Sequence, residues 1–155
     1  MIRLITHGDR YFGPDPVHTP EGIGQIRALI TKILSITVST IICGTGKRFQ
    51  EVMKIVIGYY ENIPIKFSPL CGSADGLEKD NTVVLTNGTF VAQEDYMGII
   101  GNPAIDIWKF IGSLPDNALL CAGGELMIAL GFKTLNQKGH LYEIDSATRS
   151  CRIIA

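Results

Sequence analysis

The sequence predicts an α/β fold: a three-layer α/β/α sandwich around a mainly parallel sheet with antiparallel edge strands. Short apolar runs rich in β-branched residues alternate with segments of helical periodicity, which is typical of parallel sheets covered by helices. Polar turns that contain glycine follow three of these runs, and ligands bind at such strand ends in open α/β sheets. With 155 residues, 46% of them hydrophobic, we expect one domain over residues 1–155 with a sizeable core.

The N-terminal stretch 2–10 is predicted to be a short buried strand that ends in a polar turn at His7. Gly8 then breaks the strand and lets the backbone approach another segment closely. Residues 11–18 form a loop because they contain one glycine and two prolines. This loop leads straight to the first helix, so we expect it to border a site at His7.

The first helix is predicted from a clear N-terminal signal. Thr19 is suited to be the N-cap and Pro20 the first helical residue. Apolar residues then recur at helical spacing as far as Ile33, so one face is expected to be buried. Gly22 and Gly24 weaken the first turn and would allow the helix to pack closely on the sheet.

The remaining elements follow from the same kinds of signal. Up to the middle of the chain we expect strands over 38–43 and 63–67, a helix over 47–57 and a loop over 68–80. A hairpin follows, with strands over 82–86 and 89–92 and a two-residue turn at Asn87-Gly88. The last third is predicted to contain a helix over 103–112, a strand over 118–122, a turn at 123–124, a helix over 125–130, and an antiparallel pair over 141–144 and 151–154.

Composition excludes several classes of function. The formal net charge is −1 and no basic cluster is present, so binding to nucleic acid or to an acidic membrane has no electrostatic basis. No apolar run reaches the roughly 18 residues of a membrane span, and no signal peptide is indicated. The four cysteines form no CxxC pair, which favours reduced thiols and a cytoplasmic protein. The three histidines lack metal-ligand spacing, so we predict no metal and no cofactor.

Three strand ends carry the polar residues that point to a function. They are Thr6-His7-Gly8, Gly44-Thr45-Gly46-Lys47-Arg48 and Cys121-Ala122-Gly123-Gly124. In this order, and with the helix start Thr19-Pro20-Glu21-Gly22 between the first two, they resemble the motifs of the histidine phosphatase superfamily, which has the phosphoglycerate mutase-like fold. That family has Arg-His-Gly at the first strand end, Ser-Ser-Pro-x-x-Arg at the second and Ser-His-Gly-Gly at the third.

The resemblance implies a role for each matching position. His7 would be the nucleophile that attacks phosphorus and becomes phosphohistidine, so it must be neutral and held in one tautomer. Arg48 would bind the phosphoryl oxygens and stabilise their charge in the transition state. The family also uses a second arginine, a second histidine and a carboxylic acid that protonates the leaving oxygen.

This chain departs from the family at two of those positions. Thr6 stands where the family has its first arginine, and Ala122 where it has its second histidine. Losing one such donor commonly costs about 10²–10³ in rate. Arg10 either replaces the missing arginine or is a solvated loop residue. The carboxylic acid is also unassigned, with three candidates in the middle of the chain: Asp75, Glu78 and Glu94.

Several residues have a plainer interpretation beside the functional one. His7 could be an ordinary histidine at a strand end. Arg48 could lie on the surface and pair with Glu51 three residues further on. His18 and His140 are predicted to be loop residues and not ligands. At the last strand end, Gly123-Gly124 would line the pocket, while the carboxylate of Glu125 would oppose a bound phosphate.

The preferred hypothesis is a divergent member of this family whose degenerate site binds a phosphate-containing ligand or a protein partner with little or no catalysis. An active phosphomonoester phosphatase that uses His7 is the alternative, so we leave open whether the protein is an enzyme. A third hypothesis is an oligomeric or structural module, which would expose apolar surface near Tyr59-Tyr60 or Tyr96-Met97. For the first two, the helix starts at 46–47 and 123–124 should point to the space beside His7.

Overall fold

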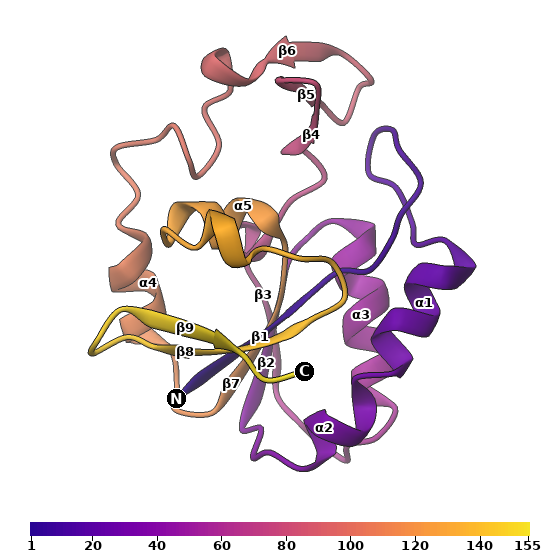
Figure 1. Ribbon diagram of the computed structural model, residues 1–155, viewed down its shortest axis with the longest axis vertical. Coiled ribbons are helices and arrows are strands. Elements are labelled where there is room, and N and C mark those ends of the chain that lie inside the picture. Colours follow the sequence, from indigo (N-terminus) through magenta and orange to yellow (C-terminus); the bar gives the residue numbers. More distant parts are fainter.

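The computed structural model describes the backbone of residues 1–155 and every side chain except that of Lys79. A sheet of six strands in the order β3-β2-β7-β1-β8-β9 forms the centre of the molecule (Figure 1). The strands are β1 (Ile2–Thr6), β2 (Thr40–Cys43), β3 (Ile65–Phe67), β7 (Ala118–Ala122), β8 (Leu141–Asp145) and β9 (Ser150–Ile153). The first four in sheet order are parallel, and β8 and β9 extend the sheet as antiparallel edge strands.

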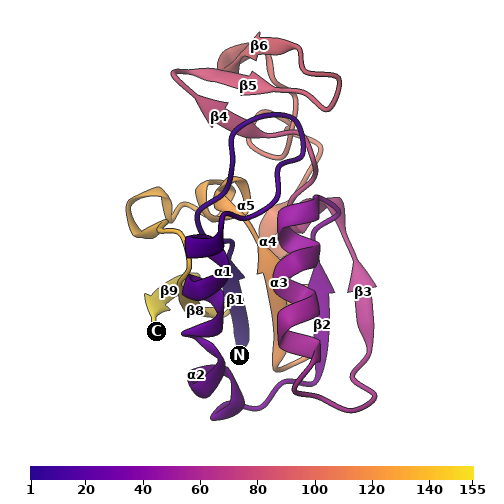
Figure 2. The ribbon, with the colours of Figure 1, turned by 90° about the vertical axis from the view of Figure 1, so that its right-hand side faces the viewer.

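Helices cover both faces of this sheet, so the predicted three-layer α/β/α sandwich is confirmed. One face carries α1 (Pro20–Arg27), α2 (Ile30–Leu34) and α3 (Lys47–Ile57), and the other carries α4 (Ile107–Ser113) and α5 (Gly124–Ala129) (Figure 2). Successive residues of β1 point into the two cores: Leu4 packs in the core under α4 and α5, and Ile5 in the core under α1 to α3. None of the helices in the described chain is long and apolar enough to cross a membrane.

A second, smaller sheet lies beyond the carboxyl ends of the parallel strands, as Figures 1 and 2 both show. It contains β4 (Leu77–Lys79), β5 (Thr82–Val84) and β6 (Phe90–Ala92), all antiparallel. The predicted hairpin is therefore present, but the two-residue turn was wrong. The Leu85 amide donates to the Thr89 carbonyl at 2.8 Å, which leaves residues 86–88 in the loop, with Gly88 at a φ of 87°. Strand β4 lies inside the stretch that we predicted to be a loop.

Two predicted helices are shorter than expected. The first begins as predicted, with the Thr19 hydroxyl accepting from the Gly22 amide at 3.1 Å, but it ends at Arg27. A tight turn interrupts it, where the Leu29 amide donates to the Ile26 carbonyl at 3.0 Å, and α2 follows. The predicted helix 103–112 begins only at Ile107, because Asp106 is its N-cap. The strands predicted over 38–43 and 63–67 are likewise shortened to β2 and β3.

The turn after β1 packs tightly against the first helix through two glycines. A Cβ atom on Gly8 would lie 2.5 Å from the Gly22 carbonyl oxygen, and one on Gly22 would overlap the Asp9 carbonyl. Gly24, by contrast, would meet nothing within 4 Å, so only Gly22 allows the close packing that we predicted for this pair. This contact brings the start of α1 against the residue that follows His7.

Candidate functional site

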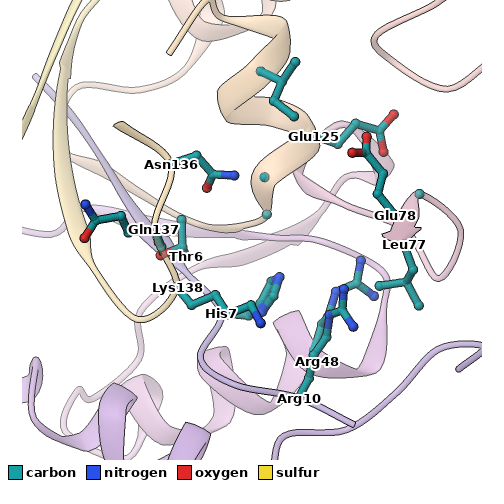
Figure 3. A pocket seen from close by; sticks show the side chains of 14 residues that line it. Thr6, His7, Arg10, Arg48, Leu77, Glu78, Glu125, Asn136, Gln137 and Lys138 are labelled. Atoms are coloured by element: carbon teal, nitrogen blue, oxygen red, sulfur yellow. Dashed lines mark hydrogen bonds between the residues drawn. The ribbon is translucent and has the colours of Figure 1, made fainter. Parts of the chain in front are cut away.

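A cavity of about 240 Å³ opens beyond the carboxyl ends of β1 and β7, beneath the small sheet (Figure 3). Eight residues singled out from the sequence line it: Thr6, His7, Arg10, Arg48, Glu78, Gly123, Gly124 and Glu125. Gly8 and Ala122 do not line the cavity. Gly8 lies behind His7 against α1, and Ala122 is fully buried in the core under α5.

His7 is buried and held in one orientation. Its Nδ1 lies 2.8 Å from the Gly8 carbonyl oxygen. Because a carbonyl only accepts, Nδ1 carries the proton and Nε2 keeps its lone pair. Burial, and then the charge of Arg48, lower the pKa of His7 from 6.5 to about 3. The imidazole is therefore neutral near pH 7, with one nitrogen available as a nucleophile or hydrogen-bond acceptor.

This lowered pKa predicts that acid destabilises the protein through His7. The unfolded chain takes up a proton below pH 6.5 and the folded chain resists it down to about pH 3, so the unfolding free energy should fall as pH falls through this window. The loss should approach about 1.4 kcal/mol per pH unit. Urea denaturation from pH 7 to pH 4.5 measures it. His7→Phe should flatten the profile, and an unchanged profile would show that His7 is not the group responsible.

Arg48, in the first turn of α3, is 4% exposed, so the predicted alternative of a surface pair with Glu51 is wrong. Its Nη2 donates to the Ser73 carbonyl at 3.2 Å, and its guanidinium lies 4.2 Å from the centre of the Phe49 ring. Nε and Nη1 are buried without a hydrogen-bond partner among the described residues. Burial, followed by the charge of Arg10, lowers the pKa of Arg48 to about 10, so it stays a cation at neutral pH.

Arg10 also reaches into the cavity, beside the His7 ring (Figure 3). Its Nη1 makes only a long 3.5 Å contact with the Tyr11 carbonyl, and its Nε is buried without a partner in the described structure. Burial lowers the pKa of Arg10. Arg10 is thus half-buried at the edge of the cavity, and among the described residues no carboxylate forms an ion pair with either guanidinium group.

Thr6 has a structural role in place of the family's arginine. Its hydroxyl donates to the Gln137 carbonyl at 2.6 Å and accepts from the His140 amide at 3.0 Å. It thus fixes the loop before β8, and three residues of that loop, Asn136, Gln137 and Lys138, line the cavity. Sequence reasoning missed these three, because no local pattern relates them to the strand ends. The pairing of β8 with β1 is what brings their loop beside His7.

Replacing Thr6 by valine should cost about 1–3 kcal/mol of unfolding free energy. Valine has nearly the same shape but leaves the His140 amide and the Gln137 carbonyl without their partner in a buried place. Chemical denaturation measures the loss. Thr6→Ser is the matched control, because it keeps the hydroxyl and should lose far less. Equal stability of the two variants would show that packing, and not the hydroxyl, fixes the loop.

Two carboxyl groups line the cavity, Glu78 and Glu125. Glu125 accepts from the Ile99 amide at 2.7 Å, and burial and Glu78 both raise its pKa. The other two predicted candidates do not line the cavity: Asp75 is bound to the amide and hydroxyl of Thr86, and Glu94 lies beside a second hollow near Tyr96. A carboxyl group with a raised pKa beside a phosphoryl site suits proton donation to a leaving oxygen. No group of three or more His, Cys, Asp or Glu among the described side chains could hold a metal ion.

The N-termini of α3 and α5 contribute less positive charge to the cavity than we predicted. The first amide of α3, on Lys47, already donates to the Asp15 carboxylate at 2.8 Å. Gly123 and Gly124 do line the cavity at the start of α5, but that helix is only about one and a half turns long. Positive charge in the cavity therefore comes mainly from side chains.

Comparison with solved structures identifies the fold. The chain has the phosphoglycerate mutase-like fold of the histidine phosphatase superfamily. It superposes on mycobacterial glucosyl-3-phosphoglycerate phosphatase with a TM-score of 0.63 and 12% identity, covering 99% of this chain and 96% of that one. For a protein assigned as an α-ribazole-5′-P phosphatase from Escherichia coli the TM-score is 0.61, with 16% identity over 98% and 93% of the two chains.

A protein assigned as the phosphohistidine phosphatase SixA from Agrobacterium tumefaciens also matches, with a TM-score of 0.59 and 10% identity over 99% of this chain and 95% of that one. No family model and no curated protein matches the sequence. At these identities the likeness establishes the fold alone, so the function has to be argued from the cavity.

Proposed function

We propose that the cavity binds the phosphoryl group of a phosphorylated ligand, with little or no turnover. The observation that carries this proposal is the buried Arg48 guanidinium, in which two nitrogens, Nε and Nη1, have no hydrogen-bond partner among the described residues. Leaving such donors unpaired costs free energy, and phosphoryl oxygens are the acceptors that fit a guanidinium best. Arg10 adds a second cation, and the lone pair of His7 Nε2 is free beside them.

Weak turnover is inferred from what the cavity lacks. Thr6 is engaged with the loop before β8, and Ala122 lies in the core, so neither position supplies a donor to a phosphoryl group. Two missing donors would together lower the rate by several orders of magnitude. The negative charge of Glu125, when it is ionised, further opposes a bound anion.

An active phosphomonoester phosphatase is the second candidate, and the orientation of His7 favours it. Nε2 would attack phosphorus while the ester oxygen leaves with a proton from Glu125 or Glu78, and water would then hydrolyse the phosphohistidine. The hydrogen bond that Nδ1 donates to the Gly8 carbonyl keeps the proton on Nδ1, so Nε2 presents its lone pair for the attack. The phosphatases among the structural neighbours are consistent with this reaction but do not demonstrate it here.

Titration of the protein with inorganic phosphate, followed by amide NMR, tests the proposal. We expect saturable shifts at Gly8, Arg48 and Gly123 and in the loop 136–138, and none when sodium chloride replaces phosphate at equal ionic strength. Shifts spread evenly over the surface, or none up to tens of millimolar phosphate, would refute it. Parallel assays with p-nitrophenyl phosphate separate the two candidates, because only the second predicts rapid turnover.

We place this function in the cytoplasm. All four cysteines are free thiols, and Cys43, Cys71 and Cys121 are buried. A reducing compartment suits this arrangement.

A further inference from the structure

His18 belongs to the loop between β1 and α1, as predicted, but it is only 5% exposed. Its imidazole lies between the backbone of Gly8 and the carboxylate of Glu51 on α3. Nε2 accepts from the Gly8 amide at 2.9 Å, and Nδ1 lies 3.0 Å from Glu51 Oε1. Nothing in the sequence pattern relates these three residues, which the fold alone brings together.

These contacts assign the tautomer of His18. The Gly8 amide can only donate, so Nε2 must present a lone pair to it. The Glu51 carboxylate can only accept, so Nδ1 must carry the proton. The same Glu51 oxygen also accepts from the His18 amide at 2.8 Å, which holds carboxylate and imidazole in one geometry. His18 is therefore a neutral imidazole whose two nitrogens are both engaged.

Gly8 connects this arrangement to His7. Its amide is held by His18, and its carbonyl accepts the Nδ1 proton of His7. The residue has little freedom elsewhere, because its Cα side faces the Gly22 backbone and the next amide, on Asp9, donates to Gln25 Oε1 at 2.8 Å. A change at His18 would thus reach His7 through a single residue.

We propose that His18, held by Glu51, is a positioning residue that fixes Gly8 so that the Gly8 carbonyl keeps His7 with Nε2 toward the cavity. The inference rests on the proposed function only for what His7 does in the cavity. The contacts among His18, Gly8 and His7 do not depend on a ligand.

The test is ¹⁵N NMR of the imidazole rings in the full chain at pH 7, without phosphate. In the native protein, His7 should show one tautomer, with the proton on Nδ1. His18→Leu should lower this preference roughly tenfold, because the Gly8 amide loses its acceptor. His18→Gln should restore it, since an amide oxygen accepts the same hydrogen bond.

His140→Gln is the matched control, because His140 lies outside this arrangement and its Nδ1 contacts only the Lys138 carbonyl among the described residues. A folded His18→Leu variant whose His7 tautomer matches the native protein would overturn the proposal. If that variant does not fold, Glu51→Leu decides. His18 then loses the acceptor that fixes its own tautomer, so the His7 preference should fall, and an unchanged His7 tautomer would overturn the proposal. This experiment uses no ligand, so its result does not depend on whether the cavity binds phosphate. A failure of this proposal and a failure of the proposed function can therefore be told apart.

Discussion

Replacing Arg48 by methionine should weaken phosphate binding by about 30-fold or more and, at the same time, stabilise the unliganded protein. Truncating one partner of a buried, hydrogen-bonded charge pair typically costs about 2–5 kcal/mol of binding free energy. The unliganded protein gains because it no longer buries, beside Arg10, a cation with two nitrogens that lack a hydrogen-bond partner in the described structure. We expect a gain of about 1–3 kcal/mol in unfolding free energy.

Calorimetric titration with phosphate and urea denaturation measure the two effects on the same samples. Lys54→Met is the matched control, because it removes a positive charge from the exposed side of the same helix and should change neither quantity appreciably. Unchanged phosphate affinity in Arg48→Met would remove Arg48 from the site. A loss of stability would show that the hydrogen bond to Ser73 and the packing on Phe49 outweigh the cost of burying the charge.

Replacing His7 by alanine should eliminate any phosphohistidine that forms in the cavity. The native protein, incubated with a reactive donor such as phosphoramidate, should be labelled slowly at His7 Nε2, the ring nitrogen that is free. Because the pKa of His7 is lowered to about 3, this nitrogen stays unprotonated well below the pH at which free imidazole becomes protonated. Labelling therefore should not fall in acid on account of His7 itself.

Mass spectrometry after an alkaline quench detects the labelled histidine. His140→Ala is the control, since it removes a histidine that does not line the cavity and should leave the labelling intact. Labelling that survives in His7→Ala would assign the reaction to another group. Rapid turnover of p-nitrophenyl phosphate by the native protein, lost in His7→Ala, would contradict the proposal of weak catalysis and establish the second candidate function.

Local signals in the sequence were enough to predict the strands of the main sheet. The run Ala118 to Ala122 was predicted with its observed bounds, because five consecutive buried residues followed by two glycines have few other interpretations. The start of α1 was also predictable, since Thr19 and Pro20 form a cap that acts within one turn. Such features depend on neighbours in the chain, and a sequence records those directly.

The rest of the site depends on contacts between distant residues. Strand β4 has three residues and exists only because it pairs with β5, so nothing in the polar stretch around it indicated a strand. Glu51 is spaced correctly for a pair with Arg48, but it binds His18, which lies 33 residues away. Arg48 itself neighbours Phe49 on α3, and only the packed structure shows that its side chain follows the buried face.

The close contact between the turn after β1 and the start of α1 bears on how relatives of this chain could be recognised. Neither Gly8 nor Gly22 can accept a side chain without moving the backbone that supports His7, because each would meet main-chain atoms of the other segment. The residues at positions 6 and 122 can change while this contact persists, because the contact between the two glycines depends on space and not on charge. A search for distant relatives should therefore weight a strand ending in His-Gly, followed fourteen residues later by a glycine in the first turn of a helix, above the arginine and second histidine of the catalytic motifs.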